Sequence, residues 1–256
     1  MATKPALVLV PGLGADAGDW PHQIDHLADV AEITVADLGP CASRAEMAEA
    51  VLSAAPGPFA LAGHSMGGWA AQEAAARAPQ RVTRLSLLNT WARPDAAVIA
   101  AQRRAIEMIG QGRFEEFLDE NLPGLVHPDR ARDAGLLAAL EAMQRRAGPQ
   151  VFARHLRALV NDSDSRAFLS LIRCPTLVVA ARQDAYFPLQ EHEFLAAAVA
   201  GARLAIVEDC GHSSTLERPQ AVTAVLRYWL TNPWAPRCLI CLSRTHSSRS
   251  KERTPS

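Results

Sequence analysis

The stretch LAGHSMGGWAAQ, from Leu61 to Gln72, places a serine between glycines where a short apolar run meets an alanine-rich segment. This pattern predicts a buried strand that turns sharply into a helix, with Ser65 at the corner. Such a corner strains the backbone, and only small residues fit two positions before and after it, here Gly63 and Gly67. The segment matches the nucleophile elbow G-x-S-x-G, although the same glycines can also serve an ordinary turn.

On both sides of this corner, short apolar runs alternate with longer segments of helical periodicity. Such alternation is typical of a parallel sheet covered by helices on both faces. The expected strands are Ala6–Val10, Glu32–Leu38, Phe59–Gly63, Arg84–Asn89, Thr176–Ala181 and Arg203–Glu208. The expected crossover helices are Asp19–Asp29, Ser43–Ala55, Met66–Ala78, Gln190–Val199 and Pro219–Leu230. We therefore predict an α/β fold with a doubly wound, mainly parallel six-stranded sheet and functional loops after the strands' carboxyl ends.

The strand pattern is interrupted between Arg93 and Arg173, where the sequence is helical throughout. We predict an α/β core formed by residues 1–93 and 172–234, with residues 94–171 as a helical lid over the strand ends. Apolar residues of this insertion can form a roof over the site: Met108, Ile109, Phe114, Phe117, Leu118, Leu137, Phe152 and Leu156. The alternative is that these helices and their apolar side chains only enlarge the core.

A loop with two glycines, LVPGLGADAGDW from Leu9 to Trp20, directly follows the first expected strand. A serine nucleophile needs two backbone N–H groups about 2.7 to 3.1 Å from the oxyanion that forms on its substrate. The N–H of Met66, directly after the serine, is one candidate, and the N–H of Leu13 is the other. Turn glycines without this role are the alternative, whereas a dinucleotide fingerprint lacks its third glycine.

Two further loops carry the groups that activate a serine. Asp184 follows the fifth expected strand in ARQDAYFP, and His212 follows the sixth in EDCGHSSTLERP. Parallel strands bring both loops to the sheet edge that carries Ser65, where a carboxylate can orient the imidazole that accepts the serine proton. The order serine, aspartate, histidine is the one that follows an elbow. Asp95, after the fourth strand, remains an alternative acid, and His64 can support the elbow.

With these residues in place, the chain from Lys4 to Leu230 resembles the α/β-hydrolase fold family, and within it small bacterial carboxylesterases with a helical lid. The motifs that carry the resemblance are PGLG with a tryptophan downstream, GHSMGG, QDAYFP and GHSSTLERP. The resemblance implies a catalytic triad and an oxyanion hole: Ser65, His212 and Asp184, and the N–H groups of Leu13 and Met66. Two departures are Pro11, where many relatives have a histidine, and the missing pair of early antiparallel strands, which leaves an all-parallel sheet.

The predicted reaction is hydrolysis of a carboxylic ester of a small molecule through an acyl-enzyme. Trp91 and Phe187, near the strand ends, are expected to contact the substrate. No metal or organic cofactor is expected. Two alternatives stay open: acyl transfer or carbon–carbon bond hydrolysis by the same triad, and a ligand-binding protein of this fold without appreciable catalysis.

The composition limits the partners. The chain has 256 residues, 49% of them apolar, and a formal net charge of -1, which offers no general attraction to nucleic acid or an anionic membrane. No apolar run approaches the roughly 20 residues of a membrane helix, and the N-terminus lacks a signal-peptide pattern. We expect a cytoplasmic monomer or homodimer with a small-molecule ester as substrate.

The cysteines are predicted to be reduced, and the last segment is assigned no function. Five scattered cysteines indicate reduced thiols, and the lone C-x-x-C formed by Cys238 and Cys241 has no second ligand pair for zinc. Residues 235–256 contain five basic residues and one acidic residue and are rich in serine. This composition predicts a disordered tail.

Overall fold

The computed structural model describes residues 4–93 and 95–234. Within them, six strands form one sheet: β1 (Ala6–Val10), β2 (Glu32–Val35), β3 (Phe59–His64), β4 (Val82–Leu88), β5 (Thr176–Ala181) and β6 (Arg203–Val207). The helices are α1 (Pro21–Leu27), α2 (Arg44–Ser53), α3 (Met66–Arg77), α4 (Ala96–Gly110), α5 (Phe114–Asn121), α6 (Ala134–Asn161), α7 (Arg166–Leu169), α8 (Leu189–Ala198), α9 (Ser214–Glu217) and α10 (Pro219–Thr231). The predicted tail, with its cysteine pair, lies outside the described residues.

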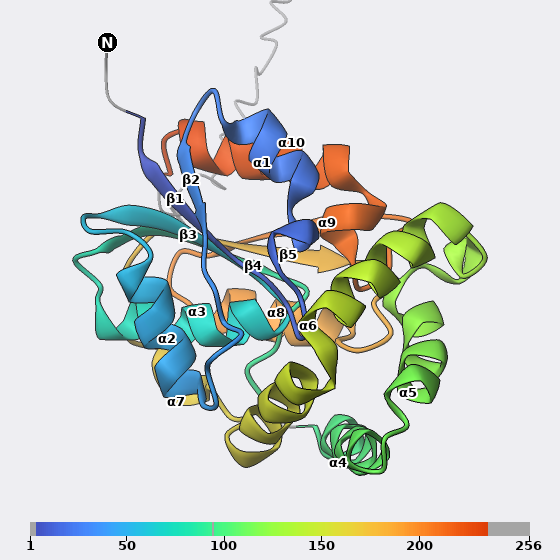
Figure 1. The fold of residues 1–256 in the computed structure, drawn as a ribbon. Coiled ribbons are helices and arrows are strands. Elements are labelled where there is room, and N and C mark those ends of the chain that lie inside the picture. Colours follow the sequence, from blue (N-terminus) through green and yellow to red (C-terminus); the bar gives the residue numbers. More distant parts are fainter. Residues whose placement is uncertain (1–3, 94, 235–256) are drawn as a thin grey trace, which may run out of the picture.

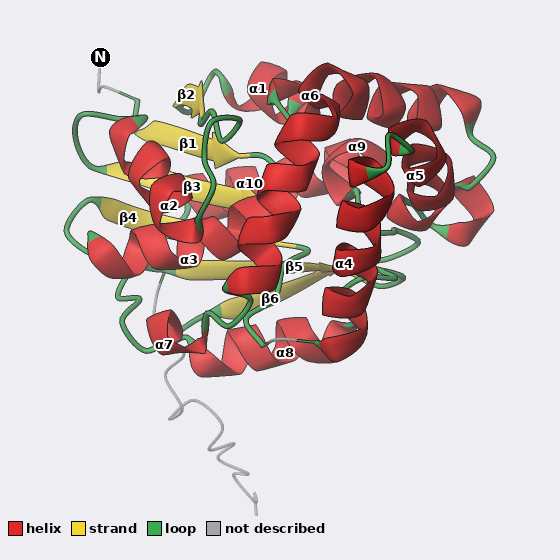
Figure 2. Cartoon of the chain, turned by 60° about the horizontal axis from the view of Figure 1, so that its bottom comes forward, coloured by secondary structure: helices red, strands yellow, loops and turns green. Residues whose placement is uncertain are grey.

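The strand order is β2-β1-β3-β4-β5-β6, and every neighbouring pair is parallel (Figures 1 and 2). The prediction of a doubly wound parallel sheet is therefore confirmed. The order reverses between β1 and β3, because the chain first adds β2 on one side of β1 and then builds outward on the other. Ligands of such sheets bind beyond the carboxyl ends of the strands at this switch point.

Helices cover both faces of the sheet. The helices α1 and α10 pack on one face, where Leu9, Trp20 and Trp229 are fully buried. The helices α2, α3 and α8 pack on the other face, and the ten residues from Met66 to Ala75 of α3 are all buried. Burial of each large apolar side chain contributes about 1.5 to 3 kcal/mol, so the sheet is a firm base for the loops at its edge.

Two expected elements have different bounds for local reasons. The strand β2 stops at Val35 rather than Leu38, because the Asp37 carboxylate accepts the N–H of Gly39 and turns the chain. The helix α1 begins at Pro21 rather than Asp19, because Ala17–Asp19 forms a separate 3₁₀ turn. A proline at the first helical position then starts the α-helix without losing a hydrogen bond.

The helices α4, α5 and α6 lie together beyond the strand ends, on the side to which the strand arrows point (Figures 1 and 2). They bury an apolar cluster of their own, which includes Leu118, Leu140 and Phe152. The helix α6 is kinked at Gly148, which has a φ of 76° and directly precedes Pro149. No described helix is both long and apolar enough to cross a membrane.

Candidate active site

Ser65 stands at the corner between β3 and α3 with φ of 52° and ψ of -120°. Only glycine fits at the two flanking positions, Gly63 and Gly67, because a side chain there would collide with the backbone. A Cβ on Gly63 would lie 2.4 Å from the carbonyl oxygen of Gly67, and one on Gly67 would lie 2.3 Å from the carbonyl oxygen of Val10. The hydroxyl of Thr90 donates to the Ser65 carbonyl at 2.8 Å and holds the strained corner. The predicted strand–serine–helix corner is thus present.

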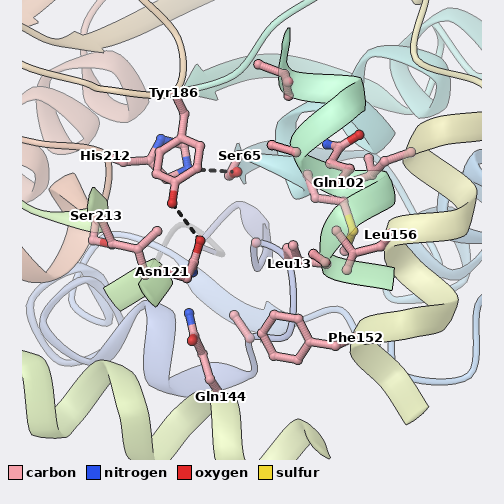
Figure 3. Close-up of a pocket in the computed structure, with 18 of the residues that line it drawn as sticks. Leu13, Ser65, Gln102, Asn121, Gln144, Phe152, Leu156, Tyr186, His212 and Ser213 are labelled. Atoms are coloured by element: carbon pink, nitrogen blue, oxygen red, sulfur yellow. Dashed lines mark hydrogen bonds between the residues drawn. The ribbon is translucent and has the colours of Figure 1, made fainter. Parts of the chain in front are cut away.

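The structure brings Ser65, His212 and Asp184 together. The Ser65 hydroxyl donates to Nε2 of His212 at 2.9 Å (Figure 3). Nδ1 of His212 donates to Oδ2 of Asp184, also at 2.9 Å. The exposed fractions are 9%, 5% and 7% for the serine, histidine and aspartate. The three residues follow β3, β6 and β5, whose carboxyl ends meet at one sheet edge.

The carboxylate of Asp184 is held in its ionised form. Burial by itself raises the pKa of Asp184, but His212 and the donors from Asn89 and Phe187 outweigh burial and lower that pKa. The Asn89 amide donates at 3.0 Å, and the N–H groups of Tyr186 and Phe187 donate at 2.9 and 3.1 Å. The sequence predicted Asn89 only as the end of a strand, and its orienting role appears first in the structure.

The alternative acid, Asp95, has another task. Its Oδ1 accepts the N–H groups of Ala97 and Val98 and caps the start of α4, and its side chain is exposed. Its carboxylate is therefore engaged in a surface cap, whereas that of Asp184 contacts His212.

A second buried pair, Asp19 and His64, lies beside the first. The Asp19 carboxylate accepts hydrogen bonds from Nδ1 of His64 at 2.9 Å, from the N–H of Gly12 at 3.0 Å and from the Thr215 hydroxyl at 3.1 Å. Nε2 of His64 donates to the carbonyl oxygen of His212 at 2.9 Å. This network ties the loop after β1, the elbow and the histidine loop together.

The contacts of His64 fit a positively charged imidazole. Its two ring nitrogens face a carboxylate and a carbonyl, both acceptors, an arrangement that favours a proton on each nitrogen. Burial lowers the pKa of His64, but the charge and hydrogen bond of Asp19 overcome this effect and raise the pKa. Burial likewise raises the pKa of Asp19, but His64 outweighs it and lowers that pKa. The expected support of the elbow by His64 takes the form of this ion pair.

A cavity of about 360 Å³ opens above Ser65. Its apolar walls include Trp91 and Phe187, the two residues predicted to contact substrate, whose rings stack 4.7 Å apart. Of the eight predicted roof residues, three line the cavity: Phe117, Phe152 and Leu156. Four others are buried in the cluster among α4, α5 and α6 instead: Met108, Ile109, Phe114 and Leu118. Leu137 packs, partly buried, against the same cluster.

The two predicted oxyanion donors belong to residues at the cavity wall. Leu13 and Met66 both line the cavity. Met66 is the first residue of α3, where backbone N–H groups have no acceptor within the helix. The N–H of Gly12 is already donated to Asp19, which leaves Leu13 as the next candidate in this loop. Gly14, with φ of 59°, has no room for a Cβ, which would lie 2.0 Å from the Phe152 ring.

The described chain contains no cluster of three His, Cys, Asp or Glu side chains suited to a metal ion. Its cysteines, Cys41, Cys174 and Cys210, form no disulfide with one another. Burial raises the pKa of the Cys174 thiol to about 11, so this thiol is not a reactive thiolate at neutral pH.

Comparison with known proteins places the chain in a family. A model described as "Alpha/beta hydrolase family" matches residues 7–225. The chain belongs to the alpha/beta hydrolase family. A protein of Azorhizobium caulinodans provisionally assigned as the carbamate hydrolase RutD is 31% identical over 86% of this chain and 89% of its own length. The pimeloyl-[acyl-carrier protein] methyl ester esterase of Aromatoleum aromaticum is 28% identical over 85% and 94% of the two chains.

A solved structure gives the same result for this alpha/beta hydrolase. The thermophilic esterase from Thermogutta terrifontis is 26% identical, aligns over 90% of each chain and has a TM-score of 0.76. The relatives thus carry hydrolase or esterase names, and the resemblance that the sequence motifs indicated is confirmed at the level of family and fold.

Proposed function

We propose that this protein is a serine hydrolase that cleaves a carboxylic ester of a small molecule, with Ser65 as nucleophile, His212 as general base and acid, and Asp184 as its orienting carboxylate. The observation that carries the proposal is the continuous chain of hydrogen bonds from Ser65 to Asp184 at the floor of an apolar cavity. The esterase names of two relatives support the reaction class.

In the first half of the reaction, the Ser65 oxygen bonds to the ester carbonyl carbon while its proton moves to Nε2 of His212. The N–H groups of Leu13 and Met66 donate hydrogen bonds to the former carbonyl oxygen, which now carries a negative charge. The carbon–oxygen bond to the alcohol then breaks, and the alcohol leaves with the proton from His212. The ionised Asp184 keeps Nδ1 protonated and stabilises the imidazolium.

In the second half, water attacks the acyl group on Ser65. His212 accepts a proton from that water, and the returning serine oxygen receives a proton when the acid departs. We assign residues 94–171 the role of a lid, whose α4 and α6 residues form the cavity roof and exclude bulk water. Residues 1–93 and 172–234 then form the core that holds the reacting groups.

The cavity supports a substrate of moderate size. Its volume of about 360 Å³ lies in the range of small-molecule pockets, and a molecule as small as the unsubstituted carbamate ion would fill only a fraction of it. We therefore favour an ester with a medium-sized acyl or alcohol portion over carbamate hydrolysis.

The test is a substrate panel of alkanoate esters, thioesters, a carbamate and a diketone, assayed with the wild type and Ser65→Ala. We expect ester hydrolysis by the wild type and a fall in kcat of roughly a millionfold in the variant, with its melting temperature nearly unchanged. Retention of most turnover by Ser65→Ala would place the nucleophile elsewhere. Cleavage of the carbamate or the diketone, without cleavage of any ester, would contradict only the assignment of an ester as the bond that is cleaved.

A further inference from the structure

Three amide side chains of α4, α5 and α6 lie in the roof of the cavity, and they are engaged differently. Gln102 comes from α4 and Gln144 from α6, and the Oε1 atom of each is buried without a hydrogen bond from the described part of the chain. Asn121, the last residue of α5, instead accepts a hydrogen bond from the Tyr186 hydroxyl at 2.6 Å (Figure 3). This bond joins the roof to the loop after β5.

The other end of Tyr186 contacts two of the three residues in the hydrogen-bonded chain at the floor. Its backbone N–H donates to Oδ1 of Asp184 at 2.9 Å. Its ring lies beside the His212 imidazole, with 4.9 Å between the ring centroids and 49° between the planes. Ring pairs at this separation attract one another. One tyrosine thus extends from the reacting groups to the roof.

Three rings surround the imidazole of His212: His64 at 5.3 Å, Phe187 at 5.6 Å, and Tyr186. The first two rings are held by neighbouring side chains, through an ion pair in one case and a stacked indole in the other. The tyrosine ring is held by its bond to Asn121. Rotation of the imidazole would move Nε2 away from the serine, and a displacement of about 1 Å in a catalytic group can cost about 100-fold in rate.

The roof segment that follows Asn121 is fastened to the histidine loop. The Leu125 carbonyl accepts the N–H of Ser213 at 2.8 Å. The Glu217 carboxylate accepts the N–H of His127 at 3.0 Å. Both floor residues of these bonds follow the catalytic histidine in the chain. The acceptor of the tyrosine hydroxyl is therefore held in place relative to the histidine loop.

The Tyr186 hydroxyl remains a donor at neutral pH. Burial, with a smaller effect of the Asp184 charge, raises the pKa of Tyr186 to about 12. A neutral phenol has a single O–H proton, and Asn121 accepts it. The orientation of the hydroxyl is thus fixed by the roof.

We infer that Tyr186 and Asn121 are positioning residues for the proposed reaction, because their hydrogen bond holds the tyrosine ring against His212 and keeps Nε2 aligned with the serine hydroxyl. This inference rests on the proposed function for the reaction that is measured. It assigns α5 a part in aligning the general base through Tyr186, in addition to its place in the cavity roof.

The first experiment removes the hydrogen bond from either side. Tyr186→Phe keeps the ring, and Asn121→Leu keeps a similar volume. We expect each to lower kcat per active site roughly 3- to 10-fold, the value of one hydrogen bond. Active sites are counted by fluorophosphonate titration, so unfolded protein does not contribute. The double variant should lose no more than the larger single loss, because both changes act on one bond. Losses that add in full, or two single variants with the wild-type kcat, would overturn the inference.

The chain offers a matched control for each change. Tyr228, the other tyrosine of the chain, is 51% exposed on α10, and Tyr228→Phe should keep the wild-type kcat. Asp119 is exposed on α5, two residues before Asn121, and Asp119→Leu should also keep it. Equal losses in these controls would attribute the effect to a general loosening of the protein and would contradict a positioning role.

The second experiment separates positioning from a contact with the substrate, because both residues also line the cavity. The substrates are methyl and butyl esters of acids from acetic to hexanoic. Alignment of the base affects every ester, so we expect Tyr186→Phe to lower kcat/KM by a similar factor across the series, down to methyl acetate. A loss confined to the longer esters would replace positioning by a contact with the substrate.

A measurement without substrate separates failure of this inference from failure of the proposed function. Proton NMR follows the Nδ1 proton of His212, which lies in the hydrogen bond to Asp184. We expect this proton to exchange with water several times faster in Tyr186→Phe than in the wild type or in Tyr228→Phe. Faster exchange, with no ester cleavage by the wild type, would keep the positioning role and remove the proposed reaction. Ester cleavage by the wild type, with unchanged exchange and unchanged kcat in Tyr186→Phe, would keep the reaction and remove the positioning role.

Discussion

The floor and the roof of the cavity satisfy their polar groups in different ways. On the floor, the Asp184 and Asp19 carboxylates accept hydrogen bonds from protein groups on several loops. In the roof, two buried glutamine oxygens have no partner among the described residues. The polar groups of the floor are thus paired within the protein, whereas the roof supplies mainly apolar walls. The floor therefore fixes the reacting groups and the roof shapes the cavity, a division of roles within one site.

The largest effect that can break this division is expected at Asp184. Asp184→Asn keeps the shape but presents an amide to Nδ1 of His212, which favours the wrong imidazole tautomer. We expect kcat for an ester substrate to fall by about 10⁴-fold, with little change in KM. Steady-state kinetics at neutral pH measure this.

Asp95→Asn is the matched control, because this residue caps α4 at the surface. We expect its kcat to be close to the wild-type value. If Asp95→Asn were the variant that lost activity while Asp184→Asn kept it, the assignment of the acid would be wrong.

The floor was largely predictable from the sequence, and the reason is local. The spacing of Gly63, Ser65 and Gly67 fixes a corner that few other residues can form, and parallel strands must bring Asp184 and His212 to the same edge. Of the supporting residues, the sequence predicts a role only for His64. It predicts Asp19 as the start of a helix, because nothing in the sequence shows that a 3₁₀ turn buries it beside His64.

The next largest effect is expected at the buried pair formed by Asp19 and His64. Asp19→Asn removes the counter-charge of a buried imidazolium, and we expect a loss of about 3 kcal/mol in the free energy of unfolding. Denaturant titration measures the change. Asp25→Asn, exposed on α1, is the control and should change the free energy by less than about 0.5 kcal/mol. A loss in Asp19→Asn no greater than in the control would show that the pair does not hold the loops together.

The same pair predicts a pH window. The pKa of Asp19 lies below its usual 3.8, so its contribution is complete above that pH and is lost as the pH falls through the folded pKa. The pKa of His64 lies above its usual 6.5, so its contribution is complete below that pH and is lost as the pH rises through the folded pKa. The stability difference between wild type and Asp19→Asn should therefore be greatest between these two values and decline on both sides. A difference that stays constant from well below pH 3.8 to well above pH 6.5 would contradict the ion pair.

The smallest effect is expected where roof and floor are joined at the surface. Arg146 of α6 holds both carboxylate oxygens of Asp16, at 2.9 and 3.0 Å, with both side chains about half exposed. We expect Arg146→Gln to lower the free energy of unfolding by about 0.5 kcal/mol, an effect that high salt reduces. Arg103→Gln, exposed on α4, is the control. A much larger loss would mean that this surface pair, rather than apolar packing, holds the roof in place.

The roof could be predicted only in part. Helical periodicity indicated apolar side chains between residues 94 and 171, but it did not separate those that line the cavity from those buried among the helices. Phe152 both lines the cavity and packs in the helical cluster, whereas Phe114 packs in the cluster without lining the cavity. Gln144 gave no signal at all, because an isolated glutamine on a helix is usually at the surface.

The most direct test of the central claim is to trap the nucleophile. The wild type is treated with a fluorophosphonate, and the modified peptide is identified by mass spectrometry. We predict one adduct, on Ser65, absent from Ser65→Ala and formed far more slowly by Asp184→Asn. An adduct on another residue, or a folded wild type that stays unmodified, would contradict the assignment of Ser65, His212 and Asp184 as one catalytic unit.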